Sequence, residues 1–523
     1  MKRYWFLAAF GFAVLAFAAV WMGALNQDEG WYLYAARMVS EGKVPYRDFF
    51  YTQAPVMPIV YSAFTSIWNE YGLLGARIFT IVLGAIGIGF FCALAARLSP
   101  VGSRGQAALV VFFLLGSNLY HLYYLAIPKT YALASLFVAV GFFLLSFVRE
   151  RGWRGAMFAV SSGMALALAA GTRISLGVLL AVVGFGLLVS FRRWRWAFLW
   201  FGLGGALSLL VIYGFFLADP SARAGLIAAQ MYHAARGGSD IVFTVGSVSR
   251  LVRWYVPLFI LLGMGIAFLV HKARVGVLPA VDGSNDAQDV SLVTWLAGIG
   301  FFAVFVIQML APFPYEDYQV PVMGLLAVVA AVVFVGGVVG LRTPDAGHQR
   351  SQLPAASSQL STLLVLGLAW ACSFGSPLLE KWTTNGQDRF WTLKKEKLEL
   401  EQLREVARMI EEEDPGGETL LTQDLYLAIE TGRRVPDGLE MGPFSMLSDE
   451  QWRALLESAP CQIAALSGYS FAIEAPRCNE VSVDRQLEYF KILKKNYELI
   501  EKEEFFGQNA TTLVVLKRKA AAK

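Results

Sequence analysis

Long apolar stretches recur from the start of the chain to about residue 377, and short polar loops separate them. The hydrocarbon core of a bilayer is about 30 Å thick, so a spanning helix needs about 20 mostly apolar residues. The pattern predicts about eleven transmembrane helices, and hence a polytopic α-helical membrane domain over residues 1–378. The predicted spans are 4–25, 72–96, 106–124, 131–148, 156–171, 174–191, 197–217, 254–271, 292–311, 318–341 and 360–377.

The basic residues of the connecting loops predict the orientation of the chain, because short cytoplasmic loops collect Lys and Arg. The apolar run after Lys2 and Arg3 is too long for a signal-peptide core, so we interpret it as a retained signal-anchor helix with the N-terminus inside. Alternate loops then carry the basic residues Arg97, Arg104, Arg149, Arg151, Arg154, Arg192, Arg193, Arg195, Lys272, Arg274, Arg342 and Arg350. This predicts a multi-pass protein of the cell inner (cytoplasmic) membrane whose first loop and C-terminal part are extracytoplasmic.

The first outer loop, residues 26–71, is expected to have structure of its own. Asn26 and Glu29 have the spacing of a capping box, and Gly42 suits the position just after a helix, so a helix is predicted over 27–41. Tryptophan and tyrosine side chains in this segment favour the membrane interface. We therefore expect this helix to lie on the membrane surface.

The loop continues with a segment expected to be extended, 45–51, and with a second surface helix over 56–68. Tyr46, Asp48 and Gln53 make this stretch polar and aromatic, which favours a functional loop over a plain connector. Asp48 contributes to a site if it folds back toward the start of the loop. The alternative is an exposed acid that pairs with the neighbouring arginine.

After residue 378 the pattern changes to short amphipathic segments, which predict a C-terminal soluble α/β domain over 379–523. A polar linker over 343–358 precedes the last predicted span. The predicted helices of the domain are 391–413, 450–458 and 483–495, and the predicted strands are 418–422, 461–466, 497–501 and 511–517.

Composition agrees with a membrane protein: 56% of the residues are hydrophobic and 16% are charged. Soluble chains carry about 25% charged residues, and charge facing lipid is costly. A formal net charge of +4 gives no indication of nucleic-acid binding. Cys461 and Cys478 could pair in an oxidising compartment, and no Cys/His cluster in the sequence indicates a metal site.

Asp28 and Glu29 are the first candidates for catalysis, because they adjoin the outer end of the first span. Neighbouring residues on a helix point in different directions, so one acid would act as the base and the other would support it. The alternative is structural, since acids in the first helical turn are favoured by the helix dipole.

Lys129, Arg173 and Arg77 are basic residues that the topology places at the outer face, where the positive-inside rule predicts few. If several converge, they form a phosphate site. Each of them could instead extend along its helix end to reach the membrane surface. Tyr318 lies in the short aromatic and acidic outer loop 312–319, which forms either a wall of the same cavity or part of an aromatic interface belt.

The residues around the first outer loop resemble those of GT-C membrane glycosyltransferases. The resemblance is to the bacterial dolichyl-phosphate-mannose-protein mannosyltransferase-like and lipid A aminoarabinose transferase-like enzymes, and it is carried by residues 20–80. The matching segments are Asp28-Glu29-Gly-Trp-Tyr-Leu-Tyr-Ala-Ala-Arg37, Glu41-Gly42-Lys43-Val-Pro45-Tyr46-Arg47-Asp48-Phe49-Phe50 and Gln53-Ala-Pro55.

The resemblance implies an inverting glycosyltransferase that moves a hexose or pentose from a polyprenyl-phosphate donor to a lipid, glycan or protein acceptor, with Asp28 as the catalytic base. Aminoarabinose transferases have a phosphate-contacting lysine where this chain has Gln53, so that role must pass to Lys129 or Arg173. Some GT-C enzymes use a divalent cation, which Asp28, Glu29 and Asp48 could share. We expect no cofactor, because lysine and arginine can neutralise the phosphate.

Two other functions compete with this one. A transporter or flippase of lipid-linked sugars would place ionisable residues near the middle of the membrane, whereas the polar residues here gather at one face. A non-catalytic assembly factor would act through its C-terminal domain and would not need Asp28.

Overall fold

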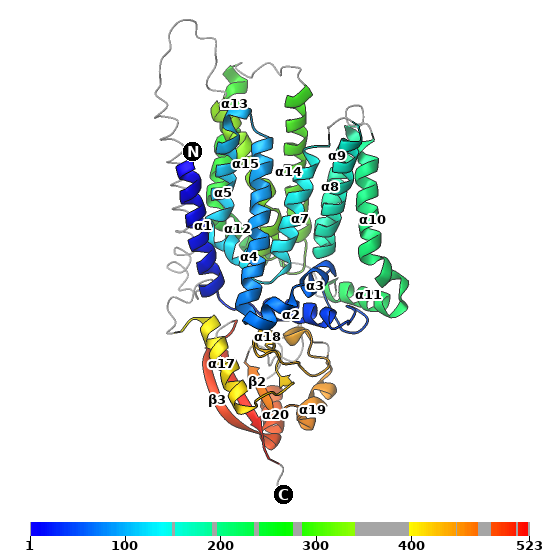
Figure 1. The fold of residues 1–523 in the computed structure, drawn as a ribbon, viewed down its shortest axis with the longest axis vertical. Helices are drawn as coiled ribbons and strands as arrows, with labels where there is room; N and C mark the ends of the chain where they lie inside the picture. Colours follow the sequence, from blue (N-terminus) through cyan, green and yellow to red (C-terminus); the bar gives the residue numbers. More distant parts are fainter. Residues whose placement is uncertain are drawn as a thin grey trace.

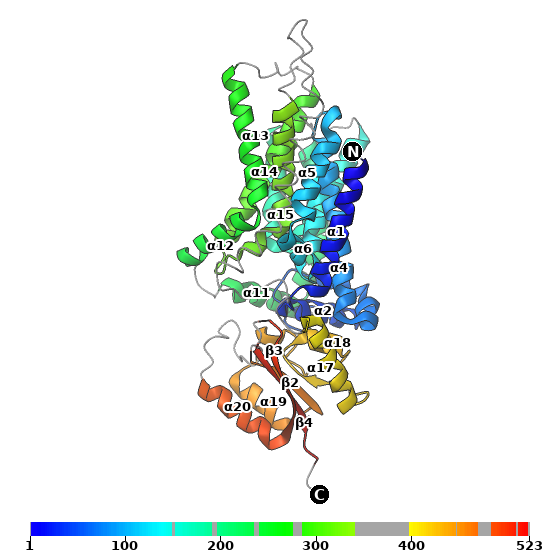
Figure 2. The same cartoon turned by 90° about the vertical axis from the view of Figure 1, so that its left-hand side faces the viewer.

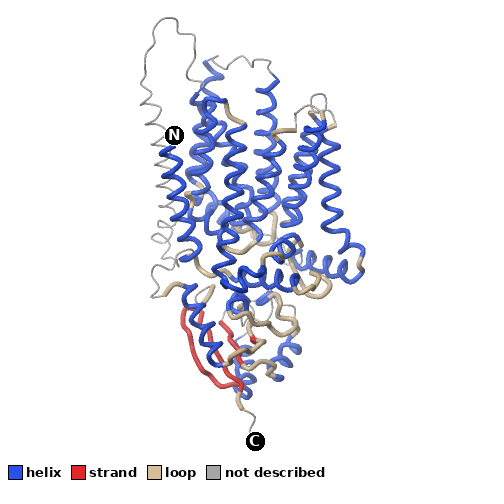
Figure 3. Tube along the Cα trace, in the orientation of Figure 1, coloured by secondary structure: helices blue, strands red, loops and turns tan. Residues whose placement is uncertain are grey.

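The computed structural model describes residues 2–148, 152–190, 196–234, 240–275, 285–339, 397–445, 447–468, 483–508 and 511–520. Figure 1 shows a bundle of long helices with a small α/β domain at one end, and Figure 3 shows that the strands among the described residues lie in that domain. The predicted span 360–377, the predicted linker and Cys478 lie outside the described residues. The domain boundary and the pairing of Cys461 with Cys478 therefore stay predictions.

The described part of the bundle agrees with the predicted spans in position. Six of its helices are long and apolar enough to cross a membrane, and counting two bent pairs as spans raises the number to eight. Two further apolar helices are shorter. This supports a multi-pass membrane protein, while the predicted number of eleven spans stays a prediction. The bundle helices are α1 (Lys2–Met22), α4 (Thr65–Arg97), α5 (Arg104–Gly116), α6 (Leu119–Ala126), α7 (Thr130–Leu145), α8 (Trp153–Thr172), α9 (Val178–Val189), α10 (Ala197–Ala218), α13 (Val256–Val275), α14 (Asn285–Met309) and α15 (Val320–Val339).

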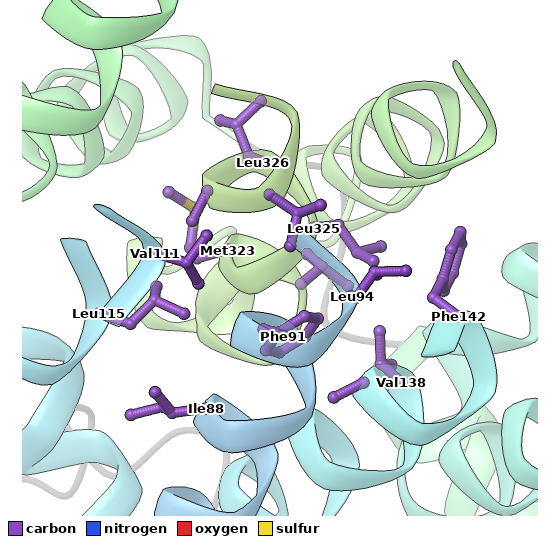
Figure 4. Close-up of a cluster of buried hydrophobic side chains, with 14 of the residues drawn as sticks. Ile88, Phe91, Leu94, Val111, Leu115, Val138, Phe142, Met323, Leu325 and Leu326 are labelled. Atoms are coloured by element: carbon purple, nitrogen blue, oxygen red, sulfur yellow. The ribbon is translucent and has the colours of Figure 1, made fainter. Parts of the chain in front are cut away.

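The core of the bundle is the meeting point of α4, α5, α7 and α15, shown in Figure 4. Phe91 of α4 is fully buried there and lies against Gly324 of α15. A Cβ atom at position 324 would come within 2.1 Å of the Phe91 ring. Small residues let membrane helices approach closely, so this glycine sets the spacing between the two helices.

Short helices lie across the end of the bundle that faces the α/β domain (Figures 1 and 2). They are α2 (Gln27–Ser40), α3 (Val56–Ser62), α11 (Pro220–Ala234) and α12 (Ile241–Trp254). The predicted capping box of α2 is present. The Asn26 side chain accepts a hydrogen bond from the Glu29 backbone N–H, and the Glu29 side chain accepts one from the Asn26 backbone N–H. Gly42 has φ +86°, as the predicted position after the helix end requires.

Two local predictions in the first loop are wrong. The second surface helix ends at Ser62 rather than residue 68, because Phe64 packs on Phe79 with ring centroids 4.7 Å apart and turns the chain into α4. The segment 45–51 contains a tight turn rather than an extended strand, because the Asp48 carboxylate accepts a hydrogen bond from the Val44 N–H at 2.8 Å.

The C-terminal domain contains a four-stranded sheet in the order β1-β2-β4-β3. β1 is parallel to β2, and the other two pairs are antiparallel. The predicted elements are found here, apart from residues 391–396, which lie outside the described part, and α18 is an additional helix too short for the pattern to reveal. The elements are α17 (Glu399–Glu413), β1 (Leu420–Leu421), α18 (Leu425–Glu430), α19 (Asp449–Ser458), β2 (Ile463–Ser467), α20 (Val483–Asn496), β3 (Tyr497–Phe506) and β4 (Thr511–Arg518).

Candidate active site

Lys129 lies between two carboxylates from different parts of the chain. Its Nζ is 2.8 Å from Asp28 Oδ2 in α2 and 3.2 Å from Asp317 Oδ2 in the short 3-10 helix Glu316–Gln319. The Tyr131 hydroxyl donates to the same Asp317 oxygen at 2.7 Å. We call Asp28, Lys129, Tyr131, Asp317 and the adjacent Arg173 the Asp28 cluster.

The Asp28 carboxylate is held in one orientation but is still reachable. Trp31, one turn further along α2, donates from Nε1 to Asp28 Oδ1 at 3.0 Å, and its ring stacks on Tyr32. Asp28 Oδ2 faces Lys129. The Asp28 side chain is 23% exposed, so a second molecule can approach it.

Lys129 carries a positive charge in this surrounding. Burial by itself would lower its pKa, but neighbouring groups, led by the Asp28 carboxylate, raise the pKa well above its usual value. An ammonium group has three N–H donors. The two carboxylates account for two of them, so one remains directed elsewhere.

Arg173 is the second cation of the cluster and follows the end of α8. Its guanidinium lies over the rings of Tyr318, at 4.3 Å from the centroid, and Tyr131, at 5.0 Å. Its NH1 also lies 3.5 Å from Thr130 Oγ1. Within the described ranges no carboxylate forms an ion pair with Arg173, so most of its N–H donors are available to an anion.

Glu29 and Arg77 form a fully buried ion pair beside the cluster. Arg77 donates to both carboxylate oxygens of Glu29, at 2.7 and 2.6 Å. Its remaining three N–H groups donate to the backbone carbonyls of Val20, Gly23 and Ala24 at the end of α1. All five donors of the guanidinium are then used.

Arg77 was predicted to bind phosphate, but with all five donors engaged its guanidinium has none left for phosphate, so we propose a structural role for it instead. The same contacts place Glu29 away from open solvent, in contact with its own helix start and with α4. We therefore assign the Glu29–Arg77 pair the role of joining α1, α2 and α4 behind Asp28.

The other candidates of the first loop are Asp48, Tyr46 and Gln53, and the contacts described below do not join them to the Asp28 cluster. Asp48 pairs with Arg47 at 2.9 Å, and this contact lowers the pKa of the Asp48 carboxyl below its usual value. The Tyr46 hydroxyl donates to the backbone carbonyl of Gln53. These contacts shape the turn of the loop, so the structure brings together Asp28, Lys129, Arg173 and the Tyr318 ring but not these three residues.

The sequence did not single out Asp317, Tyr131 or Trp31 as candidate site residues, although the loop 312–319 that contains Asp317 was predicted as a possible wall of the cavity. Asp317 had a signal, since it is one of two adjacent acids in a short outer loop. Tyr131 and Trp31 had none beyond their position next to Lys129 and Asp28, because aromatic residues are common at membrane interfaces.

The fold places the chain among proteins built like GT-C membrane glycosyltransferases. ArnT from Cupriavidus metallidurans bound to undecaprenyl phosphate matches with a TM-score of 0.62 and 15% identity, over 100% of this chain and 99% of that chain. The archaeal oligosaccharyltransferase AglB from Archaeoglobus fulgidus, in complex with an inhibitory peptide and a dolichol-phosphate, matches with a TM-score of 0.50 and 11% identity, over 98% and 74%. No family model and no curated protein sequence matches the chain. At these identities the likeness establishes the fold.

Proposed function

We propose that the chain is an inverting glycosyltransferase that moves a sugar from a polyprenyl-phosphate donor to an acceptor hydroxyl. The observation that carries this proposal is the pairing of an accessible Asp28 with Lys129, next to an arginine that has no carboxylate partner among the described residues. The fold supports it, because the similar ArnT structure holds undecaprenyl phosphate and the similar AglB structure holds dolichol-phosphate.

Asp28 acts as the general base in this reaction. The acceptor oxygen attacks the anomeric carbon from the face opposite the phosphate and gives its proton to the Asp28 carboxylate. The bond between the anomeric carbon and the phosphate oxygen breaks, and its electron pair leaves with the polyprenyl phosphate. Attack from the opposite face inverts the anomeric configuration. A phosphate leaving group needs no strong general acid, so one base suffices.

Lys129 and Arg173 hold the phosphate as negative charge accumulates on it. The two carboxylates of the Asp28 cluster balance its two cations, so a bound phosphate finds a site that is not already anionic. The third N–H of Lys129 and the available N–H groups of Arg173 supply charge-assisted hydrogen bonds. The Tyr318 and Tyr131 rings fix the guanidinium plane.

The site faces the extracytoplasmic side of the inner membrane in this proposal. Asp28 lies at the end of the bundle that carries the C-terminal domain, whereas Arg97 and Arg104 lie at the opposite end of α4 and α5 (Figure 1). The positive-inside rule puts that basic end in the cytoplasm. A lipid-linked donor then keeps its chain among the helices while its head group meets Asp28.

The residues present fit an ammonium better than a divalent cation. Lys129 Nζ occupies the position between Asp28 and Asp317 where a bridging cation would bind. No group of three or more His, Cys, Asp or Glu side chains suited to a metal is found in the described ranges. A similar oligosaccharyltransferase structure from Archaeoglobus fulgidus is a complex with Zn and sulfate.

The test is sugar transfer from undecaprenyl-phosphate-linked hexoses and pentoses by the purified chain in nanodiscs made from bacterial lipids. Wild-type protein should release undecaprenyl phosphate and label an acceptor, and Asp28→Asn should abolish both. Asp48→Asn is the matched control, because it changes the same residue type in the same loop and should stay active. Movement of the donor across the membrane without release of undecaprenyl phosphate would favour a flippase and contradict the proposal.

A further inference from the structure

The C-terminal domain packs directly on the helix that carries Asp28. Figure 2 shows α18 and α17 against the α2 end of the bundle. Gly30 of α2 lies so close to α18 that a Cβ atom on it would come within 2.2 Å of the Tyr426 backbone nitrogen. The buried apolar residues of α2 and of the C-terminal domain form one continuous core. The two parts therefore behave as one packed unit at this surface.

Two side chains of the C-terminal domain bind backbone groups just ahead of Asp28. The Leu25 N–H donates to Glu399 Oε2 at 2.6 Å, and the Gln27 N–H donates to Gln508 Oε1 at 2.6 Å. The first N–H groups of a helix have no partner within the helix. The Asn26–Glu29 capping box satisfies the N–H groups of Asn26 and Asp28, and the C-terminal domain satisfies those of Leu25 and Gln27.

A glutamate at position 399 is unexpected if this position only fills the contact between the C-terminal domain and the bundle. It is 5% exposed, and burying a carboxylate is costly unless it is paired and hydrogen-bonded. The Arg77 guanidinium, which is paired with Glu29, lies near enough to interact electrostatically with the Glu399 carboxylate. An apolar side chain would fill the space without this cost. The Leu25 N–H is one polar group that partners the buried carboxylate.

We propose that Glu399 and Gln508 are positioning residues, through which the C-terminal domain holds the turn that presents Asp28 to the acceptor. This rests on the proposed function. The C-terminal domain is then part of the catalytic unit. A small displacement of Asp28 costs rate rather than donor affinity, because Lys129 and Arg173 hold the phosphate independently of residues 25–27.

The test compares Glu399→Leu with Glu399→Gln in the full chain, using undecaprenyl-phosphate-linked sugar as donor. Leucine removes the acceptor oxygen, so kcat should fall at least about tenfold while the KM for donor stays within about twofold. Glutamine keeps an oxygen for the Leu25 N–H and should restore kcat to within about threefold of wild type. Glu412→Leu, on the exposed face of the same helix, is the control and should leave both parameters unchanged.

Gln508→Ala gives a second, milder test, since Gln508 lies in a turn beside β3. It should lower kcat and speed amide hydrogen exchange in the peptide covering residues 23–30, while exchange in α20 stays unchanged. The proposal is overturned if Glu399→Leu and Gln508→Ala keep the wild-type kcat, or if the kcat of Glu399→Gln is as low as that of Glu399→Leu. An inactive wild-type chain would instead count against the proposed function, and the exchange result would still decide whether these side chains hold the turn.

Discussion

Arg77 contacts Glu29 through both carboxylate oxygens, with neither side chain exposed to solvent. This pair joins α4 to the first turn of α2, and the three backbone carbonyls bound by Arg77 add the end of α1. The residue next to Glu29 is Asp28. The fold therefore uses a buried ion pair to fix the helix start from which the proposed base projects.

Breaking this pair should unfold the site. Removing one partner of a buried ion pair costs about 3–5 kcal/mol, because the other charge is left unpaired. Arg77→Met and Glu29→Gln should each lower the thermal midpoint of the detergent-solubilised protein sharply and reduce its monodisperse fraction. Lys502→Met removes an exposed pair with Glu504 and should change stability by less than about 1 kcal/mol. If Arg77→Met were as stable as Lys502→Met, the joining role would be wrong.

Arg173 should govern donor affinity rather than stability. Its guanidinium has no carboxylate partner among the described residues, so its removal leaves no buried charge unpaired. Arg173→Gln should weaken binding of undecaprenyl phosphate at least about tenfold, which corresponds to one charge-assisted contact of about 1.4 kcal/mol. The measurement is thermophoresis in detergent with Arg104→Gln, at the opposite end of the bundle, as control. Equal affinity in the two variants would exclude Arg173 from the phosphate site.

Removal of divalent metals should leave transfer unchanged. The ammonium of Lys129 already bridges Asp28 and Asp317, so chelation removes nothing that the proposed mechanism uses. Transfer rates measured with EDTA, and again after added Mg²⁺ or Mn²⁺, should agree within experimental error. Loss of activity with EDTA and recovery with one metal would contradict this assignment.

Position 72, where α4 is kinked, should not accept a side chain without a loss of stability. Gly72 has φ +62° and ψ −153°, and a Cβ atom there would come within 2.2 Å of Glu430 Oε2. The same carboxylate oxygen accepts the Leu73 N–H at 2.7 Å. Gly72→Ala should therefore lower the thermal midpoint, whereas Gly89→Ala in the same helix, where a Cβ atom meets nothing within 4 Å, should not. Equal thermal midpoints for Gly72→Ala and Gly89→Ala would show that position 72 tolerates a side chain.

The sequence allowed correct prediction of features that depend on neighbours in the chain. The capping box of Asn26 and Glu29 and the helix end at Gly42 follow from local backbone chemistry, and the structure contains both. The alternating polar and apolar segments gave the strands of the C-terminal domain for the same reason. Resemblance in the first loop supplied the fold, which the comparison of structures bears out.

Pairings between distant segments were not predictable. Arg77 and Lys129 have the same charge and the same expected side of the membrane. Arg77 donates all its N–H groups to Glu29 and three backbone carbonyls, whereas Lys129 contacts Asp28. The choice depends on which helices lie side by side, and periodicity does not specify that. Glu399 and Leu25 are another such pair, because helix α17 could not be placed on α1 from its amphipathic pattern.

In the proposed mechanism Asp28 takes the acceptor proton while Lys129 and Arg173 hold the donor phosphate. The measurement that tests this most directly is donor binding and turnover by Asp28→Asn in one preparation, with an undecaprenyl-phosphate-linked sugar. Asp28→Asn should bind the donor with a Kd within about threefold of wild type, and its turnover should fall at least about 100-fold, as expected for loss of a general base. Turnover near the wild-type rate, or a loss of donor binding that explains the lost turnover, would contradict this mechanism.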